Sequence, residues 1–129
     1  MNATPVIAIV DDDASVLQAM GRLVRSFGLA VELHDGGAEL LASPTIDQIA
    51  CVVTDVQMPR MSGLALFEAL RMQGRQMPVI FMTAFSREGV ARQARAAGAV
   101  CFLDKPFQDT ELLACIERAL AAGRSAPLP

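Results

Sequence analysis

The sequence predicts an α/β fold in which five parallel strands alternate with helices, a (βα)₅ arrangement. Two patterns predict it. Short apolar runs recur along the chain, and most are apolar at nearly every position, as in strands buried on both faces. The longer segments between them carry apolar residues at spacings of three and four, as in amphipathic helices. The length of 129 residues fits one domain, and the 53% apolar content excludes an intrinsically disordered chain.

Five apolar runs are the expected strands, and they occupy residues 5–10, 29–33, 49–54, 78–82 and 99–103. Four of these runs are rich in Val and Ile with little polar interruption, which is typical of the interior of a parallel sheet. The run at 29–33 contains Glu32 and is followed by His34. We therefore expect this run at an edge of the sheet, with His34 as a locally bonded or exposed side chain rather than a metal ligand.

Helical patterns follow each run. The first extends from Val16 to Phe27 and stops at Gly28, a common residue after a helix end. A short helix is expected at 36–41, a longer one after Ser62, and a last one after Asp109, a favourable capping residue.

The helix expected at 86–97 is weaker than the others, because its apolar positions are mostly alanines. Arg87, Arg92 and Arg95 cover the remainder of its surface. Two interpretations fit this pattern. The helix is either a solvated element packed through small side chains, or a lightly anchored element able to shift, since mobile segments come from the least stable parts of a fold.

Composition excludes several classes of protein. No apolar run approaches the roughly 20 residues that span a bilayer, and the first ten residues lack the basic segment of a signal peptide. We therefore expect a cytoplasmic protein. A net charge of −3 and the absence of Trp and Tyr argue against nucleic-acid binding by this domain.

The three cysteines are Cys51, Cys101 and Cys115. Their odd number and wide spacing argue against a disulfide framework and against a zinc site. All three lie within apolar stretches, so we expect buried thiols in a reducing compartment.

Polar residues stand at the predicted carboxyl ends of the strands, where ligands of parallel sheets bind. Asp11, Asp12 and Asp13 follow the first run, Asp55 the third, Thr83 the fourth and Lys105 the fifth. Carboxylates about 4 Å apart repel by about 4 kcal/mol at an effective dielectric of about 20, so the cluster must take up protons or a cation. Carboxylate oxygens suit Mg²⁺, and a lysine and a hydroxyl suit a phosphoryl group. We expect Asp13, unlike the other aspartates of this group, to cap the helix that follows it.

These residues fall within motifs that resemble the receiver domain of two-component response regulators, of the FixJ-type group. The motifs are IVDDD at 9–13, TDVQMPRMSG at 54–63, MTA at 82–84 and FLDKPF at 102–107. The resemblance runs over nearly the whole chain. It implies a flavodoxin-like three-layer sandwich with a parallel sheet of order 2-1-3-4-5, a receiver domain at 1–122, and a flexible tail or the start of a linker at 123–129.

The resemblance implies a phosphorylation site at Asp55, which would take a phosphoryl group from a histidine kinase or phosphotransfer protein. It implies that Asp11, Asp12, Asp55 and the backbone carbonyl of Gln57 hold Mg²⁺ or Mn²⁺. The protein would then be a signalling domain rather than an enzyme.

The resemblance also assigns a switch. Lys105 would pair with the phosphoryl group, Thr83 would move toward it, and Phe102 would change rotamer in step. Pro106 would follow a cis peptide bond. The output surface would combine the 86–97 helix, the last strand and the last helix, and would control a partner, an output domain or a second copy of the chain.

Three alternatives remain at this point. A haloacid-dehalogenase-type phosphohydrolase would use Asp11 as nucleophile with Mg²⁺, but it leaves Asp55 and the motif after it unexplained. A flavin-binding flavodoxin-like module would place a phosphate beside three aspartates, which repel it. A pseudo-receiver that only binds partners would be expected to lack site residues, and none is missing.

Overall fold

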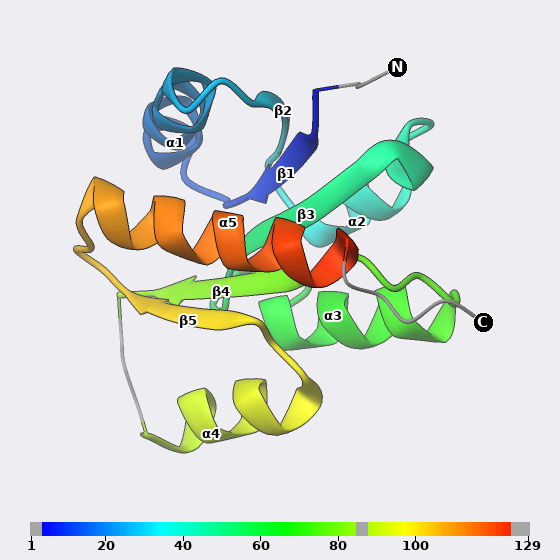
Figure 1. Cartoon of the computed structure of the whole chain (residues 1–129). Helices are drawn as coiled ribbons and strands as arrows, with labels where there is room; N and C mark the ends of the chain where they lie inside the picture. The colour runs from blue at the N-terminus through cyan, green and yellow to red at the C-terminus, as the bar shows by residue number, and fades with distance from the viewer. Residues whose placement is uncertain (1–3, 85–87, 125–129) are drawn as a thin grey trace.

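The structure is a computed structural model that describes residues 4–84 and 88–124. It contains one parallel sheet of order β2-β1-β3-β4-β5, flanked by helices on both faces (Figure 1). The strands are β1 (Val6–Val10), β2 (Ala30–His34), β3 (Ile49–Asp55), β4 (Val79–Thr83) and β5 (Cys101–Asp104). The helices are α1 (Ala14–Ser26), α2 (Gly37–Leu41), α3 (Gly63–Met72), α4 (Glu88–Ala97) and α5 (Asp109–Arg124), with a 3₁₀ turn η1 (Ile46–Gln48). The predicted fold and strand order are confirmed.

Alternating side chains divide the core into two halves. Ile7 and Ile9 of β1 belong to a cluster completed by α1 and α5, whereas Ala8 and Val10 belong to a cluster completed by α2, α3 and α4. This alternation is the period of two expected of a strand. It explains why the strands read as continuous apolar runs, because both of their faces are buried.

Helix ends follow local chemistry. The Asp13 side chain accepts hydrogen bonds from the amides of Ser15 and Val16, so its expected role as a cap is confirmed. The expected cap at Asp109 is wrong, because Asp109 is already the first residue of α5. Glu111 instead accepts a hydrogen bond from the Gln108 amide, at 2.9 Å, and so caps the helix from within its first turn.

The β5 strand begins at Cys101, later than the expected start at residue 99. The reason is the end of α4, where Gly98 adopts a positive φ of 103°. The amides of Gly98 and Ala99 donate back to Arg95 and Ala94, which closes the helix in a Schellman-type turn. Ala99 is therefore part of a helix end.

Helix α4 is anchored through Ala94, which is fully buried, while Arg92 and Arg95 are exposed. This matches the expected light packing through alanines. Residues 86 and 87 of the predicted helix, including Arg87, lie outside the described residues. In the described part of the chain, no helix is long and apolar enough to cross a membrane.

The expectation of three free thiols is wrong. Cys101 of β5 and Cys115 of α5 form a disulfide, with Cα atoms 5.9 Å apart. Helix α5 packs on the face of β5 that carries Cys101, and this packing brings Cys115 next to Cys101. The number of cysteines and their spacing in the sequence do not predict this pair. Cys51 remains a free buried thiol, and burial raises its pKa to about 12.

Candidate phosphorylation and metal site

The carboxyl ends of β1, β3, β4 and β5 bring the predicted site residues to one edge of the sheet. Asp11 follows β1, Asp55 ends β3, Thr83 ends β4, and Lys105 follows β5. The strands are in parallel register, with Asp55 beside Met82 and Thr83 beside Asp104. Four residues far apart in the sequence therefore share one site because the strands that carry them are neighbours.

Lys105 connects the two buried carboxylates of the site. Its Nζ donates to Asp55 Oδ2 at 3.0 Å and to Asp11 Oδ2 at 3.1 Å. Its backbone amide donates to the Thr83 carbonyl at 2.7 Å, which fixes the start of the loop after β5. The peptide bond from Lys105 to Pro106 is cis, as expected. The lysine is thus held from both its backbone and its side chain.

The carboxylates of Asp11, Asp12 and Asp55 form a compact acidic cluster, in which ligand atoms lie within 4.8 Å of one another. Asp11 is 1% exposed and Asp55 9%, whereas Asp12 is open to solvent. Three carboxylates with one open side fit Mg²⁺, which prefers oxygen ligands and retains several waters. These three side chains would hold the ion. Gln57 lies beside them, and its amide donates to Asp55 Oδ1 at 3.0 Å.

Burial and charge oppose one another in this cluster. Burial raises the pKa of Asp11, and hydrogen bonds from the Asp13 amide and Lys105 offset part of this effect. Burial alone would lower the pKa of Lys105, but the hydrogen bonds and charges of Asp55 and Asp11 outweigh it and raise that pKa. Lys105 therefore stays charged at neutral pH. It is the cation that balances two poorly solvated carboxylates.

The loop after β3 is held tightly against the site. The Val56 amide donates to the Met82 carbonyl and the Gly63 amide donates to the Val56 carbonyl, both at 2.9 Å. A Cβ built on Gly63 would lie 2.4 Å from the Asp55 carbonyl oxygen and 3.1 Å from Val56 Cα. Only glycine permits this approach. The sequence predicted a helix after Ser62, but the contact of Gly63 with Asp55 depends on how the loop between these two residues folds back.

Thr83 and Phe102 lie on one face of the sheet. Phe81 pairs with Phe102 in register, and Thr83 is two residues beyond Phe81, so all three side chains share the face covered by α3 and α4. Thr83 is 1% exposed. Phe102 is half-buried against the core cluster of that face. The structure thus places the two predicted switch residues on adjacent strands.

Residues 7–117 match the family profile of the response regulator receiver domain. The chain belongs to this family. Receiver domains are signalling domains of two-component systems, and the match gives no support to the phosphohydrolase alternative.

Two curated relatives illustrate the likeness of this receiver domain to bacterial regulators. The response regulator protein TodT of Pseudomonas putida is 43% identical over 115 residues, which cover 89% of this chain and 51% of TodT. The transcriptional regulatory protein FixJ of Azorhizobium caulinodans is 39% identical over 120 residues, which cover 93% of this chain and 56% of FixJ. The chain thus spans about half the length of these relatives.

A solved structure supports the same assignment. The crystal structure of FixJ-N matches with a TM-score of 0.84 and 32% identity, covering 100% of this chain and 99% of that one. This likeness confirms both the flavodoxin-like fold and the FixJ-type group predicted from the sequence motifs.

A groove beside Lys105 was missed by the sequence analysis of this receiver domain. Its volume is about 440 Å³, and its lining is mainly apolar, from Val16, Ala19, Met20, Lys105 and Phe107 among others. Val16 and Met20 belong to the apolar positions of α1, and Met20 is also part of the core cluster that α1 and α5 complete. Val16 is only partly buried, so this side of α1 lines a groove that opens next to Lys105.

A second polar cluster, centred on the Glu32 carboxylate of β2, lies close to the acidic site of the receiver domain. His34 Nε2 lies 2.8 Å from Glu32 Oε1, and the hydroxyls of Ser43 and Thr45 also donate to the Glu32 carboxylate. The His34 carbonyl accepts a hydrogen bond from the Asp11 amide at 3.2 Å. His34 is thus locally bonded, as expected, and β2 is fixed close to the acidic site.

Glu32→Gln is expected to lower the free energy of unfolding by about 1.5 kcal/mol at neutral pH, because hydrogen bonds to a charged acceptor are lost. Burial alone would raise the pKa of Glu32, but hydrogen bonds from Thr45, His34 and Ser43 lower it below 4.5. The stabilisation is present above pH 4.5 and is lost as pH falls through the lower folded pKa. Urea unfolding at pH 7 and pH 3 measures this difference.

The matched control is Glu68→Gln, on the exposed face of α3. It is expected to change stability by less than about 0.5 kcal/mol. Equal losses in the two variants, or a Glu32→Gln deficit that persists at pH 3, would contradict the assigned role of this carboxylate.

Proposed function

We propose that this receiver accepts a phosphoryl group on Asp55 from a phosphohistidine of a sensor kinase or phosphotransfer protein. The observation that supports this most strongly is the pair of hydrogen bonds from Lys105 Nζ to Asp55 and Asp11, at 3.0 and 3.1 Å, beside an acidic cluster. A nucleophilic carboxylate, a fixed cation and a metal-binding carboxylate pair are the parts that phosphoryl transfer needs.

In the reaction, one oxygen of Asp55 attacks phosphorus, an O–P bond forms, and the P–N bond to the donor imidazole breaks. The imidazole leaves with its electron pair and takes up a proton. Lys105 neutralises negative charge on the phosphoryl oxygens, which is the main task of a protein in such a transfer. Asp11, Asp12, Asp55 and the Gln57 carbonyl would hold Mg²⁺ or Mn²⁺, which would supply further positive charge at the phosphoryl group.

The phosphoryl group then biases the fold between two packings. Phosphorylated Asp55 offers new acceptor oxygens, and the Thr83 hydroxyl moves to donate to one of them. The space that Thr83 leaves on its face of the sheet admits the Phe102 ring, which changes the surface formed by α4, β5 and α5. Such a switch needs the ligand to favour one of two states, and the phosphoryl group does so by its hydrogen bonds.

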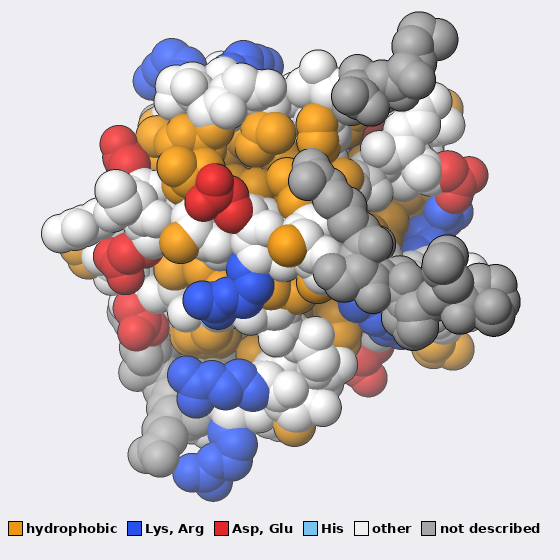
Figure 2. All heavy atoms as spheres, in the orientation of Figure 1, with side chains coloured by type: hydrophobic (Ala, Val, Ile, Leu, Met, Phe, Trp, Pro, Cys, Tyr) orange, Lys and Arg blue, Asp and Glu red, His pale blue; other side chains and the backbone are white. Residues whose placement is uncertain are grey.

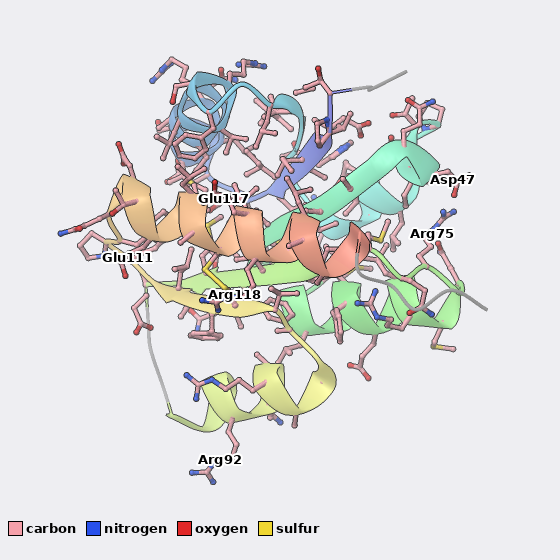
Figure 3. All side chains as sticks on the ribbon, viewed as in Figure 1. Asp47, Arg75, Arg92, Glu111, Glu117 and Arg118 are labelled. Atoms are coloured by element: carbon pink, nitrogen blue, oxygen red, sulfur yellow. A yellow bond between two sulfur atoms is a disulfide. The ribbon has the colours of Figure 1, made fainter. Side chains whose placement is uncertain are left out.

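The surface of α4, β5 and α5 is the proposed output face. Figure 2 shows basic side chains over α4 and α5, and Figure 3 places Arg92 and Arg118 on these two helices. This face would bind an output domain, a partner or a second copy of the chain. The apolar groove beside Lys105, lined in part by Val16 and Phe107, would receive the kinase or phosphotransfer protein, because it opens next to the phosphorylation site.

The names of the relatives favour a transcriptional output, which would belong to the cytoplasmic pathway expected from the sequence. FixJ is named a transcriptional regulatory protein and TodT a response regulator. Control of transcription would then run through the output face rather than through DNA binding by this domain, whose net charge is −3.

Asp55→Asn tests the function directly. The protein is mixed with acetyl phosphate, with or without Mg²⁺, and its intact mass is measured beside that of the variant. The unaltered chain is expected to gain one phosphoryl group only when Mg²⁺ is present, and Asp55→Asn is expected to gain none. Asp12→Asn, which keeps the acceptor but removes a metal ligand, is expected to slow the gain.

An adduct that survives in Asp55→Asn would move the acceptor elsewhere and contradict the proposal. Steady release of phosphate without an adduct, also unaffected by Asp55→Asn, would indicate a hydrolase centred on Asp11.

A further inference from the structure

The disulfide between Cys101 and Cys115 ties β5 to α5. Figure 3 shows the bond between sulfur atoms beside α5, with Arg118 close to it. Cys101 is the first residue of β5 and directly precedes Phe102. The link therefore joins the strand that carries the switch aromatic to a helix of the proposed output face.

The surroundings of the two sulfurs differ from those of the third cysteine. Cys101 is 9% exposed and Cys115 7%, whereas Cys51 is fully buried. Arg118 Nη1 lies 3.3 Å from Cys101 Sγ. A guanidinium at this distance places positive charge where a thiolate would form, and thiolates are the reactive form of cysteine. The pair thus has one sulfur beside a guanidinium group and a second sulfur within bonding distance of the first.

A permanent structural bond would be unusual for the compartment expected here. Disulfides of cytoplasmic proteins are mostly transient and either catalytic or redox-sensing. The bond is one contact among many in its part of the core, because both cysteines belong to a cluster that also contains buried residues of β1, β3, β4, α1 and α5. A bond with an adjacent cation, near a switch residue, points to regulation.

We propose that Cys101 and Cys115 are a reversible oxidation site, closed by a peroxide and reopened by a dithiol. The Cys101 thiolate attacks one oxygen of hydrogen peroxide, an S–O bond forms, the O–O bond breaks, and hydroxide leaves and is protonated to water. The deprotonated Cys115 sulfur then attacks Cys101, an S–S bond forms, and the second hydroxide leaves as water. Two thiols are oxidised and one peroxide is reduced to two waters.

The bond restrains β5 relative to α5. Phe102 lies on the opposite face of β5 from Cys101, and its rotamer change requires the strand and the helices around it to repack. Closing the disulfide would therefore weaken the response of the output face to phosphorylation, without removing the phosphorylation site. This last consequence rests on the proposed function, whereas closure of the bond and restraint of β5 do not.

The first experiment follows the thiols by mass. The reduced chain is treated with hydrogen peroxide, denatured, alkylated and weighed, and is then treated with dithiothreitol and weighed again. We expect peroxide to reduce alkylation from all three cysteines to Cys51 alone, and dithiothreitol to restore it. Cys51→Ala is the matched control and is expected to keep the cycle, while Cys101→Ser and Cys115→Ser each abolish it.

Over-oxidised monomers or disulfide-linked dimers in place of the internal bond would overturn the proposal. Arg118→Met is expected to slow closure about tenfold without preventing it. An unchanged rate would remove the guanidinium from the mechanism.

The second experiment measures hydrogen exchange of β5 and α5 in the oxidised and reduced chain, before and after acetyl phosphate with Mg²⁺. Oxidation is expected to slow exchange in β5 at least threefold before phosphorylation, and to halve the change that phosphorylation causes in α4 and β5. Equal exchange in the two redox forms overturns the restraint. Failure of Asp55 to take a phosphoryl group in either form would instead count against the proposed function. The restraint of β5 by the disulfide would still be tested in that case, because it depends on the exchange difference measured before phosphorylation.

Discussion

Gly63→Ala is expected to lower the free energy of unfolding by about 1–3 kcal/mol and to slow phosphorylation of Asp55 by about tenfold or more. The added Cβ would lie 2.4 Å from the Asp55 carbonyl oxygen and 3.2 Å from the Asp55 carbonyl carbon. Both neighbours are backbone atoms, so no flexible side chain can yield. The strand end that carries Asp55 must move, and with it the carboxylate that faces Lys105.

Denaturant unfolding and the rate of mass gain from acetyl phosphate measure these two effects. The matched control is Gly89→Ala in α4, where an added Cβ meets nothing within 4 Å. That variant is expected to be slightly stabilised, because alanine favours a helix over glycine. A Gly63→Ala protein with unaltered stability and rate would show that the loop after β3 is not as rigid as its hydrogen bonds indicate.

Lys105→Met is expected to lower the free energy of unfolding by about 2–3 kcal/mol at pH 7 without metal, because it leaves the buried Asp11 and Asp55 carboxylates without their cation. The side chain of Lys105 is 21% exposed, and that of Asp11 is 2% exposed. The same variant is expected to slow phosphorylation of Asp55 by about 10–100-fold, since a positive charge aimed at the phosphoryl oxygens is lost.

The pH dependence of this deficit has a defined sign. Because the folded pKa of Lys105 is raised above 10.5, its stabilisation is fully present below that pH and is lost as pH rises through the folded value. The deficit of Lys105→Met relative to the unaltered chain should therefore persist from neutral to moderately alkaline pH and shrink above pH 10.5.

Two further variants separate charge from packing. Lys105→Met combined with Asp11→Asn is expected to recover part of the lost stability, because the unpaired buried charge is gone. Arg22→Met, which removes an exposed cation from α1, should leave stability and phosphorylation nearly unchanged. Equal losses in Arg22→Met and Lys105→Met would refute a specific role for the lysine.

The sequence predicted most of the fold and of the site for one physical reason. Parallel strands place their carboxyl ends at one edge, so Asp11, Asp55, Thr83 and Lys105 could be brought together without knowledge of distances. The prediction of three free thiols was wrong because the pairing of cysteines depends on packing between a strand and a helix. Cys101 and Cys115 pair because α5 packs against β5, and the number of cysteines in a sequence does not predict such packing.

Local details were missed for a similar reason. The start of α5 is capped by Glu111 rather than Asp109, because a side chain inside the first turn reaches back to the Gln108 amide. The contact of Gly63 with Asp55 requires the loop between them to fold back on the strand. Both depend on geometry over a few residues that apolar periodicity does not encode.

Lys105 is the only lysine in the sequence, and the other residues of the combined Lys and Arg count are all arginines. The protein's single side-chain amine therefore lies inside its acidic site. Reagents that couple proteins to sensor surfaces, dyes or cross-linkers through lysine would, at this amine, modify the site itself. The same property makes acylation of Lys105 a direct footprint, because a change in the reactivity of this one amine would report occupancy of the site without any label having to be introduced.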